Sequence, residues 1–107
     1  MKSWLKQGDA YGIPVAITLD GAPLDIDETD AVEICIGTLR KLYPEEVSYD
    51  AESGEFSFPV TQEETFAMKE GGTVPVDVRV KLISGEVIGA RGVQYMPVFD
   101  AISGEVL

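Results

Sequence analysis

Residues 73–83, TVPVDVRVKLI, decide the fold, because an apolar side chain stands at every second position of this segment. Pro75, Asp77, Arg79 and Lys81 occupy the positions between them. A period of two is typical of a β-strand that turns one face to a core and the other to water. The sequence therefore predicts a long strand with one buried face, formed by Val74, Val76, Val78, Val80 and Leu82.

The same alternation recurs along the chain, and turn residues separate the segments that show it. A polar connection at 22–30 interrupts the series, and its Leu24 and Ile26 are expected to reach the core. Pro14 indicates a strand beginning or an edge. The other predicted strands lie at 13–19 before the turn Asp20-Gly21, at 31–37, at 45–50 and 55–60 around a turn at Ser53-Gly54, at 86–90 after the turn Ser84-Gly85, and at 92–99.

Residues 61–72 form the one segment with helical signals. Thr61 and Glu64 have the spacing of a capping box, and Gly71-Gly72 supplies a stop. A helix of about two turns is not stable alone, so we expect it to lean on the sheet through Phe66. Residues 38–43, TLRKLY, fit one helical face or a strand, and Pro44 ends either.

These elements predict one all-β domain over residues 1–107, an antiparallel β-sandwich of about seven or eight strands with one short helix. A small barrel would show the same alternation and stays open as an alternative. With 107 residues the chain is long enough to bury its own core.

The composition bears on partners and compartment. Nineteen acidic against eight basic residues give a net charge of −11, which disfavours binding to nucleic acid. The N-terminus MKSWLKQGDA lacks the apolar region of a Sec signal, and nowhere do residues suited to a membrane span run together. Cys35 is the single cysteine, which excludes an intrachain disulfide and favours synthesis inside the cell.

Little in the sequence points to catalysis. Histidine is absent, and with it the usual general base and zinc ligand. Cys35 has no basic neighbour in sequence to lower its pKa, so we expect an inert, packed thiol. No glycine-rich loop precedes a helix to hold a phosphate. We expect a protein that is not an enzyme and uses no cofactor.

The loop LDIDETD gathers Asp25, Asp27, Glu28 and Asp30. Carboxylate-rich loops bind calcium, but the spacing here fails the EF-hand pattern, so a solvated acidic loop is the simpler interpretation. Asp25, Asp27 and Asp30 stay weak candidates for a metal site.

Apolar residues at both ends of the chain suggest a surface for association. Tryptophan is enriched at binding hot spots, although Trp4 and Tyr11 also suit residues that close one end of a core. An open sandwich has unpaired strand edges that a partner strand can complete. The candidate interface residues are Trp4, Leu5, Ile102, Val106 and Leu107.

The order QGDAYGIPVAITLDGAPLDIDETDAVEICIG, residues 7–37, resembles the opening of small structural proteins of phage and prophage tails and baseplates of Gram-positive bacteria. A "gD…" start, an apolar strand, a "dG.pld" turn and a "t.veF.i" strand begin the N-terminal domain of their upper baseplate proteins. The second half is similar to the run "G.f.f.lt.eeT….g…vqvrv….G.v" at 54–88, and SGEVL resembles the ending of such proteins.

This resemblance implies an immunoglobulin-like sandwich with a structural, non-enzymatic role, and it carries over no catalytic residue. Other tail or baseplate proteins, or a second copy of the chain, are the implied partners, and the virion is the implied location after synthesis in the bacterial cytoplasm. The alternative is a small immunoglobulin-like binding module for carbohydrate or protein, with calcium as a possible aid. The third hypothesis is an enzyme subunit or regulatory domain that lacks chemistry of its own.

Overall fold

The computed structural model of the chain describes residues 5–6, 10–19, 22–68, 73–89 and 94–99. Within these residues the protein is all-β, and eight of its strands have three or more residues. The elements are β1 Leu5–Lys6, β2 Tyr11–Ala16, β3 Thr18–Leu19, β4 Ala22–Pro23, the 3-10 helix η1 Ile26–Glu28, β5 Thr29–Ile36, β6 Leu39–Tyr43, β7 Ser48–Asp50, β8 Glu55–Val60, α1 Gln62–Phe66, β9 Thr73–Leu82, β10 Val87–Gly89 and β11 Gln94–Phe99.

The larger sheet has the strand order β1-β11-β9-β5-β6, and β10 also pairs with β9. Its pairs are antiparallel except for β1 with β11, which run parallel. The ten-residue strand β9 is the centre of this sheet. One of its edges pairs with β5, and the other is divided between β11 and β10.

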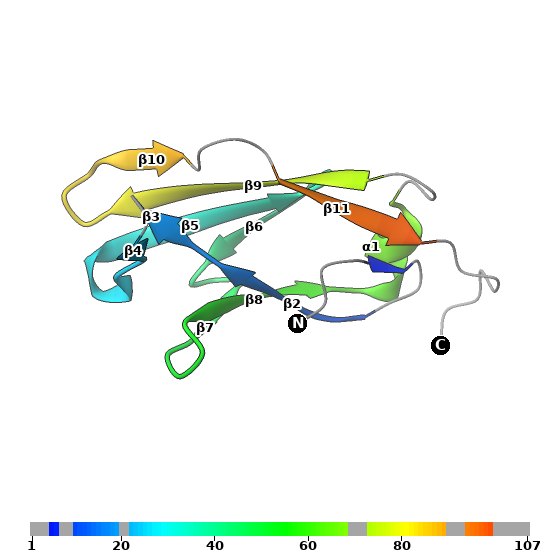
Figure 1. Cartoon of the computed structure of the whole chain (residues 1–107), viewed down its shortest axis with the longest axis horizontal. Coiled ribbons are helices and arrows are strands. Elements are labelled where there is room, and N and C mark those ends of the chain that lie inside the picture. Colours follow the sequence, from blue (N-terminus) through cyan, green and yellow to red (C-terminus); the bar gives the residue numbers. More distant parts are fainter. Residues whose placement is uncertain (1–4, 7–9, 20–21, 69–72, 90–93, 100–107) are drawn as a thin grey trace.

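The smaller sheet has the order β2-β8-β7, and β3 and β4 form a separate two-stranded ribbon. Figure 1 shows β2 and β8 running along the opposite side of the molecule from β9 and β5. Within the described residues the strands form separate sheets, as predicted for an all-β sandwich, and do not close into a barrel.

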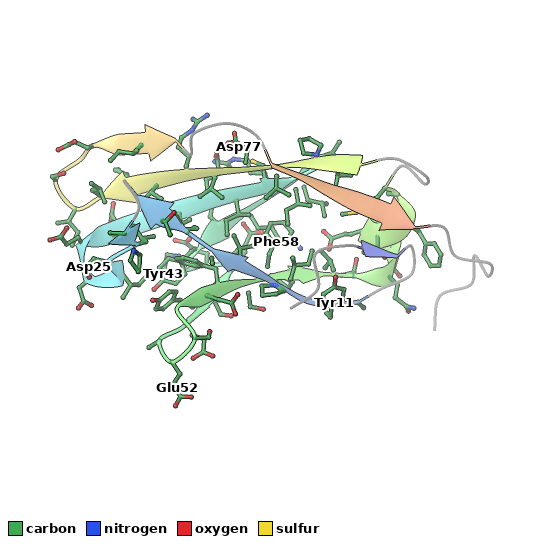
Figure 2. All side chains as sticks on the ribbon, viewed as in Figure 1. Tyr11, Asp25, Tyr43, Glu52, Phe58 and Asp77 are labelled. Carbon is green, nitrogen blue, oxygen red and sulfur yellow. The ribbon has the colours of Figure 1, made fainter. Side chains whose placement is uncertain are left out.

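The core lies between the sheets, where Figure 2 shows Phe58. Along β9 the predicted stripe faces the core: Val74 and Val80 are buried, Val76, Val78 and Leu82 are half-buried against the core, and the residues between them are exposed. Leu24 and Ile26 also pack against the core as expected. The buried apolar residues are Ile13, Val32, Ile34, Ile36, Val47, Phe56, Phe58, Val60, Met68, Val74 and Val80.

The ambiguous segment at 38–43 is a strand. Gly37 has a φ of 62°, a conformation that glycine adopts without strain, and it turns the chain so that Leu39 pairs with Ile36. Leu39 and Tyr43 then pack against the core, Lys41 reaches Pro59 and Phe58 of the second sheet, and Arg40 is exposed. The hairpin predicted around Ser53-Gly54 is confirmed as β7 and β8.

The helix α1 begins as predicted, because Thr61 and Glu64 form both hydrogen bonds of a capping box. The expected anchor was wrong. Thr65 and Met68 are buried, whereas Phe66 is only half-buried. In so short a helix the sequence does not fix which side meets the sheet, and here the Thr65 hydroxyl satisfies its own hydrogen bond by donating to the Gln62 carbonyl. The predicted stop at Gly71-Gly72 lies outside the described residues.

Candidate protein-interaction surface

The acidic loop is ordered by its own hydrogen bonds. Asp25 caps η1, since its Oδ1 accepts a hydrogen bond of 3.0 Å from the Asp27 N–H. The Thr29 hydroxyl donates to the Asp25 carbonyl at 2.9 Å. One candidate metal ligand is therefore used as a helix cap, an ordinary role for aspartate at this position.

Asp30, another candidate metal ligand, is paired with a cation. The pairing of β5 with β9 shifts between Thr29 and Ala31, so Asp30 is an extra residue in the strand, as in a β-bulge. Its Oδ2 lies 3.8 Å from the Nζ of Lys81. Among the described residues, no group of three or more histidines, cysteines, aspartates or glutamates is arranged to hold a metal ion.

The hairpin that joins β9 to β10 lies beside this loop. The Ile83 N–H donates to the Glu28 carbonyl at 2.9 Å, although the two residues are far apart in sequence. The hairpin closes on itself, because the Leu82 N–H donates to the Glu86 carbonyl and the Gly85 N–H to the Leu82 carbonyl. Gly85 has a φ of 96°, as hairpin loops of this length require.

Two apolar residues of this hairpin face solvent. Ile83 is 68% exposed and Val87 is 57% exposed, and they are the large apolar residues that the described part of the chain leaves exposed. Val87 stands opposite Lys81 in the β9–β10 register, so both side chains lie on the outer face of the sheet. We call the hairpin together with the acidic loop that it contacts the hairpin end. It comprises the exposed residues Ile83, Val87, Asp25, Asp27, Glu28, Asp30, Lys81 and Glu86.

Figure 2 shows Asp25 at the same extremity of the molecule as the β9–β10 turn of Figure 1. Every charged residue of the hairpin end is exposed. The surface is thus an apolar tip beside a row of carboxylates.

Two strand edges that an open sandwich would offer are blunted. At the β6 edge, the Leu42 N–H donates to Oε1 of Glu46, and the Leu42 carbonyl accepts from the N–H groups of Glu46 and Val47. Pro14 lies in β2, an edge strand of the smaller sheet, which confirms its predicted edge position. Proline has no N–H to donate to an added strand. Proline and covered backbone groups are devices that oppose strand addition.

The outer face of the larger sheet carries paired charges. Glu33 accepts a hydrogen bond of 2.5 Å from Arg40 and lies 3.9 Å from Arg79. Cys35 sits among them, half-exposed and not packed in the core. Desolvation and then the carboxylates of Glu33 and Asp77 raise the pKa of the Cys35 thiol. A raised pKa agrees with the expected inert thiol, because the thiolate is the reactive form.

The predicted interface residues at the termini lie largely outside the described residues, namely Trp4, Ile102, Val106 and Leu107. For Leu5 the structure describes the backbone, which pairs with Val98 in β1 and β11. Tyr11 is half-buried and packs against the core.

Sequence reasoning missed the hairpin end, although a signal was present. The pentapeptide Ile-Ser-Gly-Glu-Val occurs twice, at 83–87 and at 102–106. Its second copy contains the interface candidates Ile102 and Val106, and its first copy forms the turn of the hairpin end. The repeat would have drawn attention to Ile83 and Val87.

In comparisons with known proteins, no family model, no curated protein and no solved structure matches the chain. None of the described helices has both the length and the apolar character that crossing a membrane demands.

Proposed function

We propose that this chain is a non-enzymatic assembly module that binds other proteins in a phage or prophage tail or baseplate. The observation that carries the proposal is the hairpin end, where Ile83 and Val87 are both exposed in one hairpin at an extremity of the sandwich. Exposed apolar side chains rimmed by polar residues are typical of protein-interaction sites.

The charged groups of the rest of the molecule support a structural role. Lys41 and Glu64 connect strand β6 with helix α1, Glu33 pairs with Arg40, and Glu46 covers a strand edge. These side chains stabilise the sandwich and cover a strand edge. In the described part of the chain, the exposed large apolar side chains lie at the hairpin end.

The setting in a tail or baseplate rests on the sequence resemblance of residues 7–37 and 54–88, and a sandwich of two sheets agrees with it. In this proposal the sandwich is of the immunoglobulin-like type. Its partners are other tail or baseplate proteins or further copies of itself, and it is a virion component.

Two tyrosines on neighbouring strands do not favour the alternative of a sugar-binding module. Tyr43 and Tyr49 pack on the buried ring of Phe56, with centroid distances of 5.3 Å and 4.9 Å. Both tyrosines are half-buried against the core, so their rings do not form an exposed stacking platform.

The experiment that tests the proposal is co-expression of the chain with the products of the genes that flank its own. We expect at least one flanking product to co-purify and to be a tail-tube, tape-measure or baseplate component. Flanking genes for hydrolases or export proteins, with no co-purifying tail component, would contradict the proposal.

A further inference from the structure

We propose that the hairpin end docks a different protein, one whose apolar contact surface is flanked by lysine or arginine, and not a second copy of the same end. This inference rests on the proposed function and specifies the partner. Three features of the hairpin end carry it: the placement of its apolar residues, the fixed backbone beneath them and the sign of the surrounding charge.

The placement of Ile83 is unusual for a loop. Tight turns favour glycine, proline, asparagine, aspartate and serine, and Ser84-Gly85 follow this preference. An isoleucine that is 68% exposed buries little apolar surface, so it contributes little to the stability of the fold. Val87, in the strand that follows, adds a second apolar side chain on the outer face. Together they provide an apolar contact that the fold does not require.

The backbone beneath the tip is held on two sides. The Glu28 carbonyl accepts the Ile83 N–H, and the hydrogen bonds of Leu82 and Gly85 close the turn. Because the turn is already ordered, binding of a partner costs little conformational entropy of this loop, and less of the contact energy is lost. The hairpin end is therefore preorganised for docking.

The negative charge of the hairpin end favours a positively charged partner. Five exposed carboxylates, those of Asp25, Asp27, Glu28, Asp30 and Glu86, accompany one ammonium group, that of Lys81, for a local charge of −4. A two-fold contact between two copies would bring these like charges together, because such an interface places the same patch on both sides. Like charges facing each other oppose association, and complementary charges favour it. The surface thus fits a partner with positive charge around an apolar centre.

The test is site-specific photo-crosslinking in the full chain co-expressed with its flanking gene products. The crosslinking residue p-benzoylphenylalanine replaces Ile83 in one variant. In the matched control it replaces Glu52, an exposed residue in the β7–β8 turn that Figure 2 shows projecting elsewhere on the molecule. We expect a crosslink to a flanking product from position 83 and none from position 52.

A charge-reversal pair completes the test. Asp27→Lys with Glu86→Lys is expected to raise the Kd for that product about tenfold and to weaken its salt dependence. Asp50→Lys with Glu52→Lys, the same change of charge in the β7–β8 hairpin, is expected to leave the Kd unchanged. All four positions are exposed, so we expect each variant to fold with an unchanged Tm. A thermal melt of each variant verifies this.

The outcomes separate this inference from the proposed function. If a flanking product binds but crosslinks only from position 52, the inference is overturned and the proposed function stands. The same holds if the Kd for that product is unchanged by charge reversal at Asp27 and Glu86. A crosslink from position 83 to a second copy of the chain also overturns it. If no flanking product binds the unaltered chain, the proposed function fails and this inference fails with it.

Discussion

The Nζ of Lys41 lies 3.1 Å from Oε1 of Glu64 and also hydrogen-bonds to the carbonyl of Pro59. Lys41 belongs to β6 of the larger sheet, whereas Pro59 belongs to β8 of the smaller sheet and Glu64 to the helix that follows it. The ammonium group also lies 5.2 Å from the ring centre of Phe58. This single cation therefore ties the two layers of the sandwich together.

Replacement of Lys41 should destabilise the fold measurably. Lys41→Met keeps most of the side-chain packing on Phe58 but removes the donor, so the free energy of unfolding should fall by about 1–2 kcal/mol. Lys41 is only 14% exposed, which limits screening by solvent. In urea unfolding, the control Lys81→Met should change stability by less than ~0.5 kcal/mol, since its pair with Asp30 is exposed and 3.8 Å long. Equal effects of the two substitutions would contradict the role of Lys41.

The same pair makes stability depend on acid pH. Burial, the largest single influence, raises the pKa of the Glu64 carboxyl, but hydrogen bonds from the Thr61 N–H and from Lys41 outweigh it, and the pKa lies below its ordinary value of 4.5. A pKa lowered by folding contributes stability above the unfolded pKa, and this contribution is lost as the pH falls through the folded pKa. The stability advantage of the native chain over Glu64→Gln should therefore shrink as unfolding is measured from pH 7 down to below the folded pKa. A difference that stays constant over this range would contradict the assignment.

The alternating residues of β9 and β10 offer three matched substitutions. Val80 is 1% exposed, so Val80→Asp would bury an unpaired carboxylate and should lower stability by several kcal/mol, enough to unfold most domains of this size. Val78→Asp should destabilise less, because Val78 is half-buried. Val87→Asp should leave the Tm nearly unchanged, since Val87 is 57% exposed. A folded Val80→Asp protein with the native Tm would refute the core assignment.

Calcium should have little effect on the fold. A ligand present at ~100 times its Kd that binds only the folded state adds about 2.7 kcal/mol of stability. The Asp25 carboxylate already caps η1, and Asp30 pairs with Lys81, so the loop does not gather these groups around one point. Thermal melts in millimolar calcium and in chelator should nearly coincide. A shift of several degrees that Asp25→Ala with Asp27→Ala abolishes would establish a calcium site instead.

The elements that the sequence predicts well are those with local signals. The period of two predicts the stripe from Val74 to Leu82, and the spacing of Thr61 and Glu64 predicts the capping box. The segment 38–43 needed tertiary context, because its pairing with β5 after the Gly37 turn decides between helix and strand. The anchor of α1 was missed for a related reason: a helix of five residues has too little periodicity to distinguish Thr65 from Phe66.

The hairpin end could be predicted only in part. The turn at Ser84-Gly85 and the acidic loop are both visible in the sequence. Their contact through the Ile83 N–H and the Glu28 carbonyl joins segments more than fifty residues apart, and no local pattern predicts it. The exposure of Ile83 was also hidden, because an apolar residue that follows an apolar strand looks like part of that strand.

Light scattering coupled to size-exclusion chromatography tests most directly whether the chain is an assembly module. The chain is measured at high concentration, by itself and after co-expression with its flanking gene products. In the co-expressed sample we predict a discrete complex with a flanking product at fixed stoichiometry, which Ile83→Asp combined with Val87→Asp disrupts while the Tm stays near its native value. A strict monomer that co-purifies with none of these products would contradict the account.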